Sequence, residues 1–225
     1  MVVASILVTF AYGMSVRTTY TDLYRNHEWV GDDYKNCYCA ALTDVQMTKH
    51  WMSFTEESVA ELPYCIKCSP VSEPVVSYDN IRYEVEVLKV FRSEGDLHEG
   101  DIIWISRAWS VSQSQDSDEV YLELNFRNIM QQEQAYMVFF ESVEEMKQTK
   151  YPEKIYMLPD YAIAPFFAYE DGTNVYMNPV SSDNTYIFYQ PVADNEVFAS
   201  DKEVADAYLT YKKQIINTYD KDAKL

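Results

Sequence analysis

The chain has 225 residues, of which 48% are hydrophobic and 15% aromatic, and its formal net charge is −18. This apolar content excludes an intrinsically disordered protein, and the length suits one large domain or two small ones. The negative charge repels polyphosphate and anionic lipid surfaces, so it argues against nucleic acid and acidic membranes as ligands.

The first segment, residues 1–16, is apolar and has no charged side chain before Arg17. It is shorter than the roughly 20 apolar residues of a membrane-spanning helix, and it has the length of the hydrophobic region of a signal peptide. Ala11-Tyr12-Gly13 has the small-x-small spacing that a signal peptidase accepts, although no basic residue precedes the run. We therefore expect residues 1–16 to be a signal peptide or a truncated membrane anchor, with a buried apolar element as the alternative. Either of the first two interpretations places the protein outside the cell or at its surface.

Residues 17–36 are polar and aromatic without a clear period, so they are expected to form a connector. The remaining residues, 37–225, contain no repeat and no low-complexity linker, which favours a single β-rich domain. A short helix is expected near 54–62. Ser53 and Thr55 precede acidic residues at its start, and Pro63 stops it.

From residue 75 the hydrophobic pattern changes to a period of two. Ile81, Tyr83, Val85 and Val87 alternate with charged residues, as in a strand with one solvated face. Further strands are expected at 102–109, 119–126, 135–143, 161–172, 174–179 and 184–191. The strand at 135–143 is almost continuously apolar and should be central, whereas Pro165 marks an edge strand or a bulge. Short polar joints between these strands favour a meander or a barrel over a βαβ sheet.

An amphipathic helix is expected at the C-terminal end of the chain. Ser200 and Glu203 have the spacing of a capping box. One apolar stripe then follows at helical spacing, formed by Val204, Ala207, Tyr208, Tyr211, Ile215 and Ile216. The predicted fold class is therefore mainly β, with a short helix before the strands and an amphipathic helix after them.

The chain contains four cysteines, Cys37 and Cys39 as C-x-C and Cys65 and Cys68 as C-x-x-C. An even number of cysteines in an exported protein favours two disulfides, and because a bridge within C-x-C is strained, we expect crosswise links between the two pairs. Each link would close a loop of about 30 residues and contribute about 3 kcal/mol in the chain-entropy model. A zinc site, a redox dithiol and free thiols remain the alternatives, although Ser69-Pro70 argues against a helix starting at the C-x-x-C, as a redox dithiol would require.

Catalytic motifs are not recognisable in this sequence. The three histidines, His27, His50 and His98, lie in unrelated segments, and the five glycines form neither a phosphate-binding loop nor a nucleophile elbow. Asp116, Asp118 and Glu119 lie in a polar loop, where a solvated charge run is favoured over a calcium site. No catalytic residue, metal ligand or cofactor is assigned. Paired carboxylates leave no sequence signature, so a carboxylate-based hydrolase remains an alternative.

Residues 81–142 resemble the netrin-like domains, which include the tissue inhibitors of metalloproteinases. The segments "IRYEVEVLKVFRSEGDLHEGDIIWIS" and "QQEQAYMVFF" have the order of features found in that family. The matching residues are Lys89, Gly100, Ile103, Ile105, Tyr136, Val138 and Phe139. The resemblance implies an OB-like, five-stranded Greek-key barrel. Protease inhibition is not implied, because the C-x-C of this chain lies far from any expected mature N-terminus.

The 20 tyrosines suit half-buried strand positions, where the ring packs and the hydroxyl stays solvated. Together with the export signal, they predict a non-catalytic binding domain that recognises a protein, peptide or glycan on a tyrosine-rich face. The alternatives are the hydrolase and a structural spacer in an assembly of the cell envelope.

Overall fold

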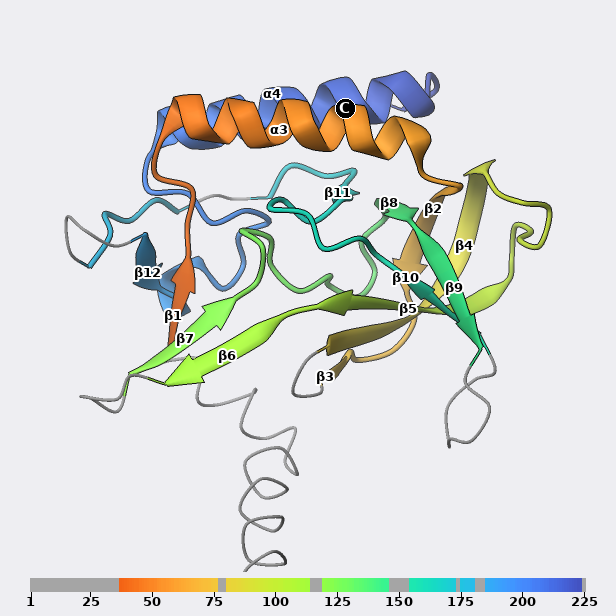
Figure 1. The fold of residues 1–225 in the computed structure, drawn as a ribbon, viewed down its shortest axis with the longest axis horizontal. Coiled ribbons are helices and arrows are strands. Elements are labelled where there is room, and N and C mark those ends of the chain that lie inside the picture. Colours follow the sequence, from red (N-terminus) through yellow and green to blue (C-terminus); the bar gives the residue numbers. More distant parts are fainter. Residues whose placement is uncertain are drawn as a thin grey trace, which may run out of the picture.

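The computed structural model describes residues 37–76, 80–113, 119–145, 154–172, 175–180 and 185–223 (Figure 1). The expected signal segment 1–16, the connector 17–36, Asp116 and Asp118 lie outside the described residues. In the described part the protein is mainly β, with two α-helices, as the sequence predicts. The strands are β1 Cys37–Ala40, β2 Tyr64–Pro70, β3 Val75–Val76, β4 Asn80–Arg92, β5 Ile102–Ala108, β6 Ser110–Gln113, β7 Val120–Glu123, β8 Tyr136–Phe140, β9 Ser142–Glu145, β10 Lys154–Met157, β11 Phe166–Ala168 and β12 Tyr186–Phe188. The helices are α3 Val45–Glu61 and α4 Lys202–Tyr219, and Gln190–Val192 forms a short 3₁₀ helix, η2.

The smaller sheet has four strands in the order β12-β1-β7-β6. Strand β1 lies inside it, antiparallel to β12 and parallel to β7. Segments far apart in the sequence therefore meet in this sheet, since β1, β7 and β12 begin at Cys37, Val120 and Tyr186 (Figure 1).

The larger sheet has eight strands, with the path β11-β8-β2-β4-β5-β10-β9 and β3 paired to β4. It is mixed, because β10 pairs with β5 in parallel and the other described pairs are antiparallel. Glu141 is the single residue between β8 and β9, although these two strands pair with β2 and β10 respectively. No closed barrel is found in the described part of the chain.

The alternation expected from residue 81 is confirmed in β4. Ile81, Tyr83, Val85 and Val87 are buried, whereas Glu84 and Glu86 lie on the opposite face and pair with Trp104 and Ile102 of β5. The turn between β4 and β5 uses Gly95 and Gly100, which both have positive φ. Because a side chain disfavours this backbone region, glycine suits these positions.

The central and edge strands also lie where the sequence predicts. All five residues of β8 are buried, and β8 has a neighbour on each side, whereas β11 begins just after Pro165 and lies at the edge. The strands at 161–172 and 184–191 are shorter than expected, and residues 175–180 form no strand.

Helix α3 begins earlier than predicted, since its N-cap is Asp44, whose carboxylate accepts from the N–H of Met47 at 2.6 Å. The predicted start signal at Ser53 and Thr55 lies inside the helix, where the Thr55 hydroxyl donates to the carbonyl of Trp51 at 2.9 Å. Threonine makes this bond readily within a helix, so its presence did not mark a terminus.

Helix α4 is confirmed, with its cap one residue later than expected. Asp201, rather than Ser200, accepts from the N–H of Val204 at 3.0 Å. The predicted stripe is buried except for Ala207, which is half-buried. Helices α3 and α4 lie side by side over one face of the larger sheet (Figure 1).

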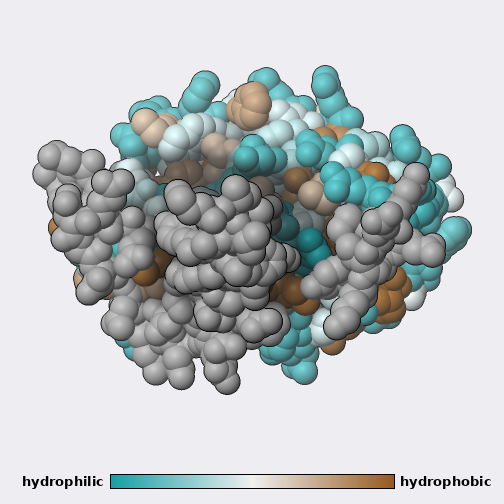
Figure 2. All heavy atoms as spheres, turned by 60° about the horizontal axis from the view of Figure 1, so that its bottom comes forward, coloured by the Kyte–Doolittle hydropathy of each residue, from teal (hydrophilic) through white to brown (hydrophobic). Residues whose placement is uncertain are grey.

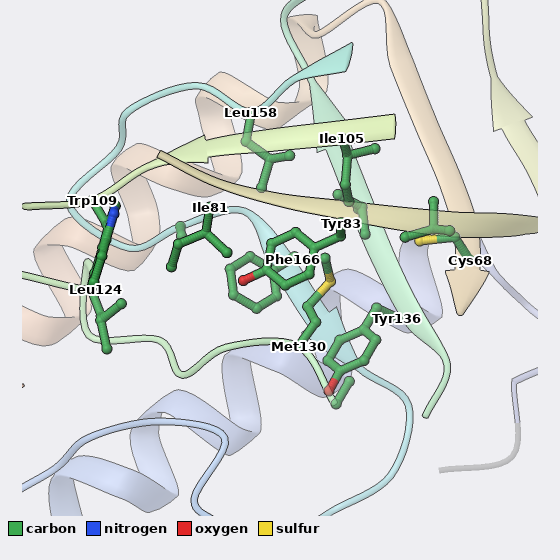
Figure 3. Close-up of a cluster of buried hydrophobic side chains, with 14 of the residues drawn as sticks. Cys68, Ile81, Tyr83, Ile105, Trp109, Leu124, Met130, Tyr136, Leu158 and Phe166 are labelled. Atoms are coloured by element: carbon green, nitrogen blue, oxygen red, sulfur yellow. The ribbon is translucent and has the colours of Figure 1, made fainter. Parts of the chain in front are cut away.

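Two apolar clusters form the core. One lies under α3 and α4 and includes Met137, Phe139 and Phe167 on that face of the sheet. The other includes Tyr83, Tyr136 and Phe166 from the larger sheet (Figure 3). Cys39 and Leu122 from the smaller sheet belong to the same cluster. This second cluster holds the smaller sheet against the larger one, and the side chains of the smaller sheet that do not enter it lie on the opposite face of that sheet.

Candidate functional site

The face of the smaller sheet that points away from this second cluster has four aromatic side chains, of which Phe188 is exposed. Along β1, β7 and β12 the side chains alternate, so that Cys37, Cys39, Leu122 and Ile187 enter the core. Their neighbours Tyr38, Tyr121, Tyr186 and Phe188 lie on the opposite face and, with Glu119 and Glu123, are called here the tyrosine face.

Three rings form a row across three neighbouring strands. Tyr38 is the register partner of both Phe188 on β12 and Tyr121 on β7. Its ring centroid lies 4.5 Å from that of Phe188 and 5.4 Å from that of Tyr121. Such cross-strand aromatic pairs stabilise a sheet and fix the orientation of the rings. Phe188 remains 41% exposed, so one end of the row is open to solvent.

A fourth ring lies beside this row. Tyr186 is the register partner of Ala40, and its hydroxyl donates a hydrogen bond to Glu123. Because Ala40 is small, Tyr186 reaches past it from β12 to β7. The Tyr186 ring also meets Tyr121 edge to face, with the centroids 4.8 Å apart.

Glu119 orders the other two hydroxyls of the tyrosine face. Its two carboxylate oxygens accept from Tyr38 at 3.2 Å and from Tyr121 at 2.8 Å. The hydrogen bond to Glu119 raises the pKa of Tyr121, whereas burial is the main cause that raises the pKa of Tyr38. Burial, followed by the bond to Glu123, raises the pKa of Tyr186 to about 12. All three phenols therefore stay protonated at physiological pH and act as donors.

This arrangement presents groups that can contact a ligand. It offers rigid ring faces and edges for contact with apolar or sugar CH groups, and two carboxylates whose orientation is fixed by phenols. Within the described residues no group of three or more His, Cys, Asp or Glu side chains is placed to hold a metal ion.

Most other described tyrosines belong to the core. Tyr83, Tyr136 and Tyr208 are buried, and no tyrosine in the described ranges is classed as exposed. The tyrosine count therefore reflects mainly interior packing, and the tyrosine-rich face is limited to one sheet.

The four cysteines do not form the expected crosswise clasp. All four are free and buried, and they are not within disulfide distance. The reason is topological, because Cys37 and Cys39 lie on β1 of the smaller sheet, whereas Cys65 and Cys68 lie on β2 of the larger sheet. Cys65 also belongs to the cluster under the helices and Cys68 to the other cluster, so these two face opposite sides of β2. Burial raises the pKa of the Cys39, Cys65 and Cys68 thiols, which makes them poor ligands and nucleophiles.

The remaining residues considered from the sequence are not brought together. His50 lies on α3 and His98 in the turn before β5, while His27 lies outside the described residues. Among the three acidic residues of the polar loop that were considered as a calcium site, Glu119 lies within the described residues. Its carboxylate accepts hydrogen bonds from two tyrosine hydroxyls.

Sequence reasoning missed Glu119, Glu123 and Phe188 as members of a common surface. A local signal does exist, because Tyr121-Leu122-Glu123 and Tyr186-Ile187-Phe188 alternate around a buried residue. The pairing of both segments with β1 was not predictable from that alternation alone.

Comparison with known proteins found no family model and no curated protein that matches this chain. Across the residues that the structure describes, no helix is long and apolar enough to cross a membrane.

Proposed function

We propose that this protein is an exported binding domain that recognises a protein, peptide or glycan on its tyrosine face. The observation that supports this most directly is the ring row Phe188–Tyr38–Tyr121, which is ordered across three strands and open at Phe188. A surface of rigid aromatic side chains loses little conformational entropy on binding, so it is favourable for recognition.

An OB-like Greek-key barrel is the proposed finer description of the larger sheet. Strands β8 and β9 are separated by Glu141 alone, and the N–H of Glu141 donates to the carbonyl of Met157 at 3.0 Å. If β8 and β9 are treated as one bent strand, that strand pairs with β2 through β8 and with β10 through β9. The order β2-β4-β5-β10-β9 then continues through β8 and returns to β2, which is the order of a closed barrel. This order and the resemblance at residues 81–142 support the proposal, although such a fold does not specify a ligand.

Export is proposed from the apolar residues 1–16. The cysteines give this proposal no support, because they are free in the structure. Intact mass of the protein recovered from the producing cells tests it. Cleavage after Gly13, or recovery of the full-length chain with the membrane fraction, supports export or tethering, and an uncleaved chain in the soluble cytoplasmic fraction contradicts it.

Site-specific photo-crosslinking tests the tyrosine face. A photoreactive phenylalanine analogue replaces Phe188 in the full chain, and the matched control places it at Phe54, which is 55% exposed on α3. The proposal predicts a crosslinked partner at Phe188 and none of the same mass at Phe54.

The affinity of the purified partner for variants of the protein then tests whether the crosslink reflects specific binding. Tyr121→Ala should weaken this binding at least tenfold, as expected for the loss of an aromatic anchor in an interface. Lys49→Ala on α3 should leave it unchanged. Equal crosslinking at both positions, or an unaltered affinity of Tyr121→Ala, would contradict the proposed site.

A further inference from the structure

A second recognition site is suggested by a surface pocket on the larger sheet, away from the tyrosine face. The pocket has a volume of about 320 Å³ and lies where β5 and β10 begin. This volume is at the lower end of the range of roughly 300–1,000 Å³ for small-ligand sites, so it suits one side chain or a small molecule. The lining residues on which the argument depends are Asp96, Asp101, Ile103, Trp104, Lys154 and Tyr156.

The fold holds the acidic side of the pocket in place. Asp101 directly precedes β5, and its Oδ2 accepts from the N–H of His98 at 2.7 Å. Gly100, with φ of +88°, donates its N–H to the carbonyl of Val87 at 2.8 Å and so closes the turn. These backbone bonds fix Asp101 before any ligand arrives.

The aromatic side of the pocket is equally ordered. Tyr156 contacts Tyr64 edge to face, with 5.4 Å between ring centroids, and its hydroxyl donates to Asp96 Oδ2 at 2.9 Å. This bond orients the Asp96 carboxylate and uses one of its two oxygens. Trp104 is half-buried and adds indole surface beside Ile103.

The electrostatic field at this pocket is negative. Asp96 and Asp101 line it, and Glu94 nearby accepts from the Tyr64 hydroxyl at 3.2 Å. Burial, then the charges of Asp96 and Glu94, raise the pKa of Tyr64 to about 12. Lys154 is the one cation in the lining, and within the part of the chain described it forms no ion pair with these carboxylates.

We propose that this pocket binds an organic cation, namely the ammonium or guanidinium group of a lysine or arginine side chain on a partner protein. Oriented carboxylates form charge-assisted hydrogen bonds with such groups, and aromatic rings attract them through their negative faces. The net charge of −18 also favours the approach of a basic partner. The site is independent of the tyrosine face, because it lies on the other sheet.

The test uses the isotope-labelled full chain and a pair of small probes. N-acetyl-lysine methylamide carries the ammonium group, and N-acetyl-norleucine methylamide is its neutral counterpart. NMR titration follows the indole N–H of Trp104, assigned with Trp104→Phe. The lysine probe should shift this signal to saturation, and the norleucine probe should leave it in place. Equal shifts from both probes, or none from either, would overturn the proposal.

Substitutions in the lining test the sign of the charge effect. Asp96→Asn retains an acceptor for Tyr156 and should weaken binding about tenfold, since a hydrogen bond to a charged group is lost. Lys154→Met removes a competing cation, so binding should be unchanged or tighter. Glu73→Gln removes one exposed charge that is not in the pocket lining, and it should alter binding less than about twofold because salt screens exposed charges. Weaker binding by Lys154→Met, or an equal effect of Asp96→Asn and Glu73→Gln, would show that the pocket is not a cation site.

Discussion

Arg127 and Glu196 form a buried ion pair, in which Arg127 Nη2 lies 2.9 Å from Glu196 Oε1 and the two side chains are 0% and 8% exposed. The same carboxylate accepts from Lys212 Nζ at 2.7 Å and from the Tyr208 hydroxyl at 3.1 Å. Glu196 therefore links two residues of α4 to Arg127, which follows β7. Its negative charge offsets the positive charges of two buried side chains.

Removal of this charge should be strongly destabilising. We expect Glu196→Gln to lower the free energy of unfolding by about 3–5 kcal/mol, because it leaves Arg127 and Lys212 without their shared buried partner. Urea denaturation followed by circular dichroism measures the effect. Asp171→Asn is the control, because Asp171 also binds Lys212, at 2.9 Å, but is 43% exposed, and it should cost less than about 1 kcal/mol. Equal effects of the two substitutions would contradict the assigned role of Glu196.

The raised pKa values of the buried and half-buried tyrosines predict that the protein loses stability in alkaline solution. Burial is the main cause that raises the pKa of Tyr64, Tyr136 and Tyr186 to about 12. A phenol whose pKa is higher in the folded state stabilises the fold below its unfolded pKa of about 10, and this contribution is lost as the pH rises toward the folded value. The free energy of unfolding should thus fall between about pH 10 and 12, and phenolate absorbance should develop later than in the denatured chain. Coincident titration of native and denatured protein would disprove this.

The sequence predicted those parts of the fold that local periodicity determines. The alternation of Ile81 to Val87 and the stripe of α4 were correct because each segment has one face against the core. The predicted start of α3 was wrong because Thr55, which is a common capping residue, lies inside the helix and donates a hydrogen bond to the carbonyl of Trp51. Its true cap, Asp44, has no glutamate or glutamine three residues later to mark it.

Long-range pairing accounts for what the sequence could not predict. The tyrosine face depends on β1 lying between β7 and β12, and nothing in residues 37–40 specifies either partner. The cysteine prediction failed to match the structure for the same reason, because the two pairs enter different sheets. An even number of cysteines predicts disulfides only when the fold brings the thiols within bonding distance of one another.

The thiols give a direct test of this arrangement. The intact mass should be the same with and without reductant, and a thiol reagent should modify the native protein slowly and the urea-denatured protein fully. Burial and the raised thiol pKa both reduce the fraction of reactive thiolate. A mass lower by about four hydrogens before reduction would indicate two disulfides, as predicted from the sequence, and would contradict the free thiols of the structure.

A double-mutant cycle tests the ring row of the tyrosine face. Tyr38→Leu and Phe188→Leu each remove one partner of the pair whose centroids are 4.5 Å apart, so their combined cost should be smaller than the sum of the single costs. The expected coupling is about 0.5–1.5 kcal/mol, which is typical of an aromatic pair. Tyr38→Leu combined with Phe54→Leu on α3 is the control and should be additive, because these residues belong to separate surfaces. Coupling in the control but none between Tyr38 and Phe188 would mean that the row is not formed in solution. Coupling confined to Tyr38 and Phe188 would mean that the rings are already aligned before a ligand binds, as recognition by this face requires.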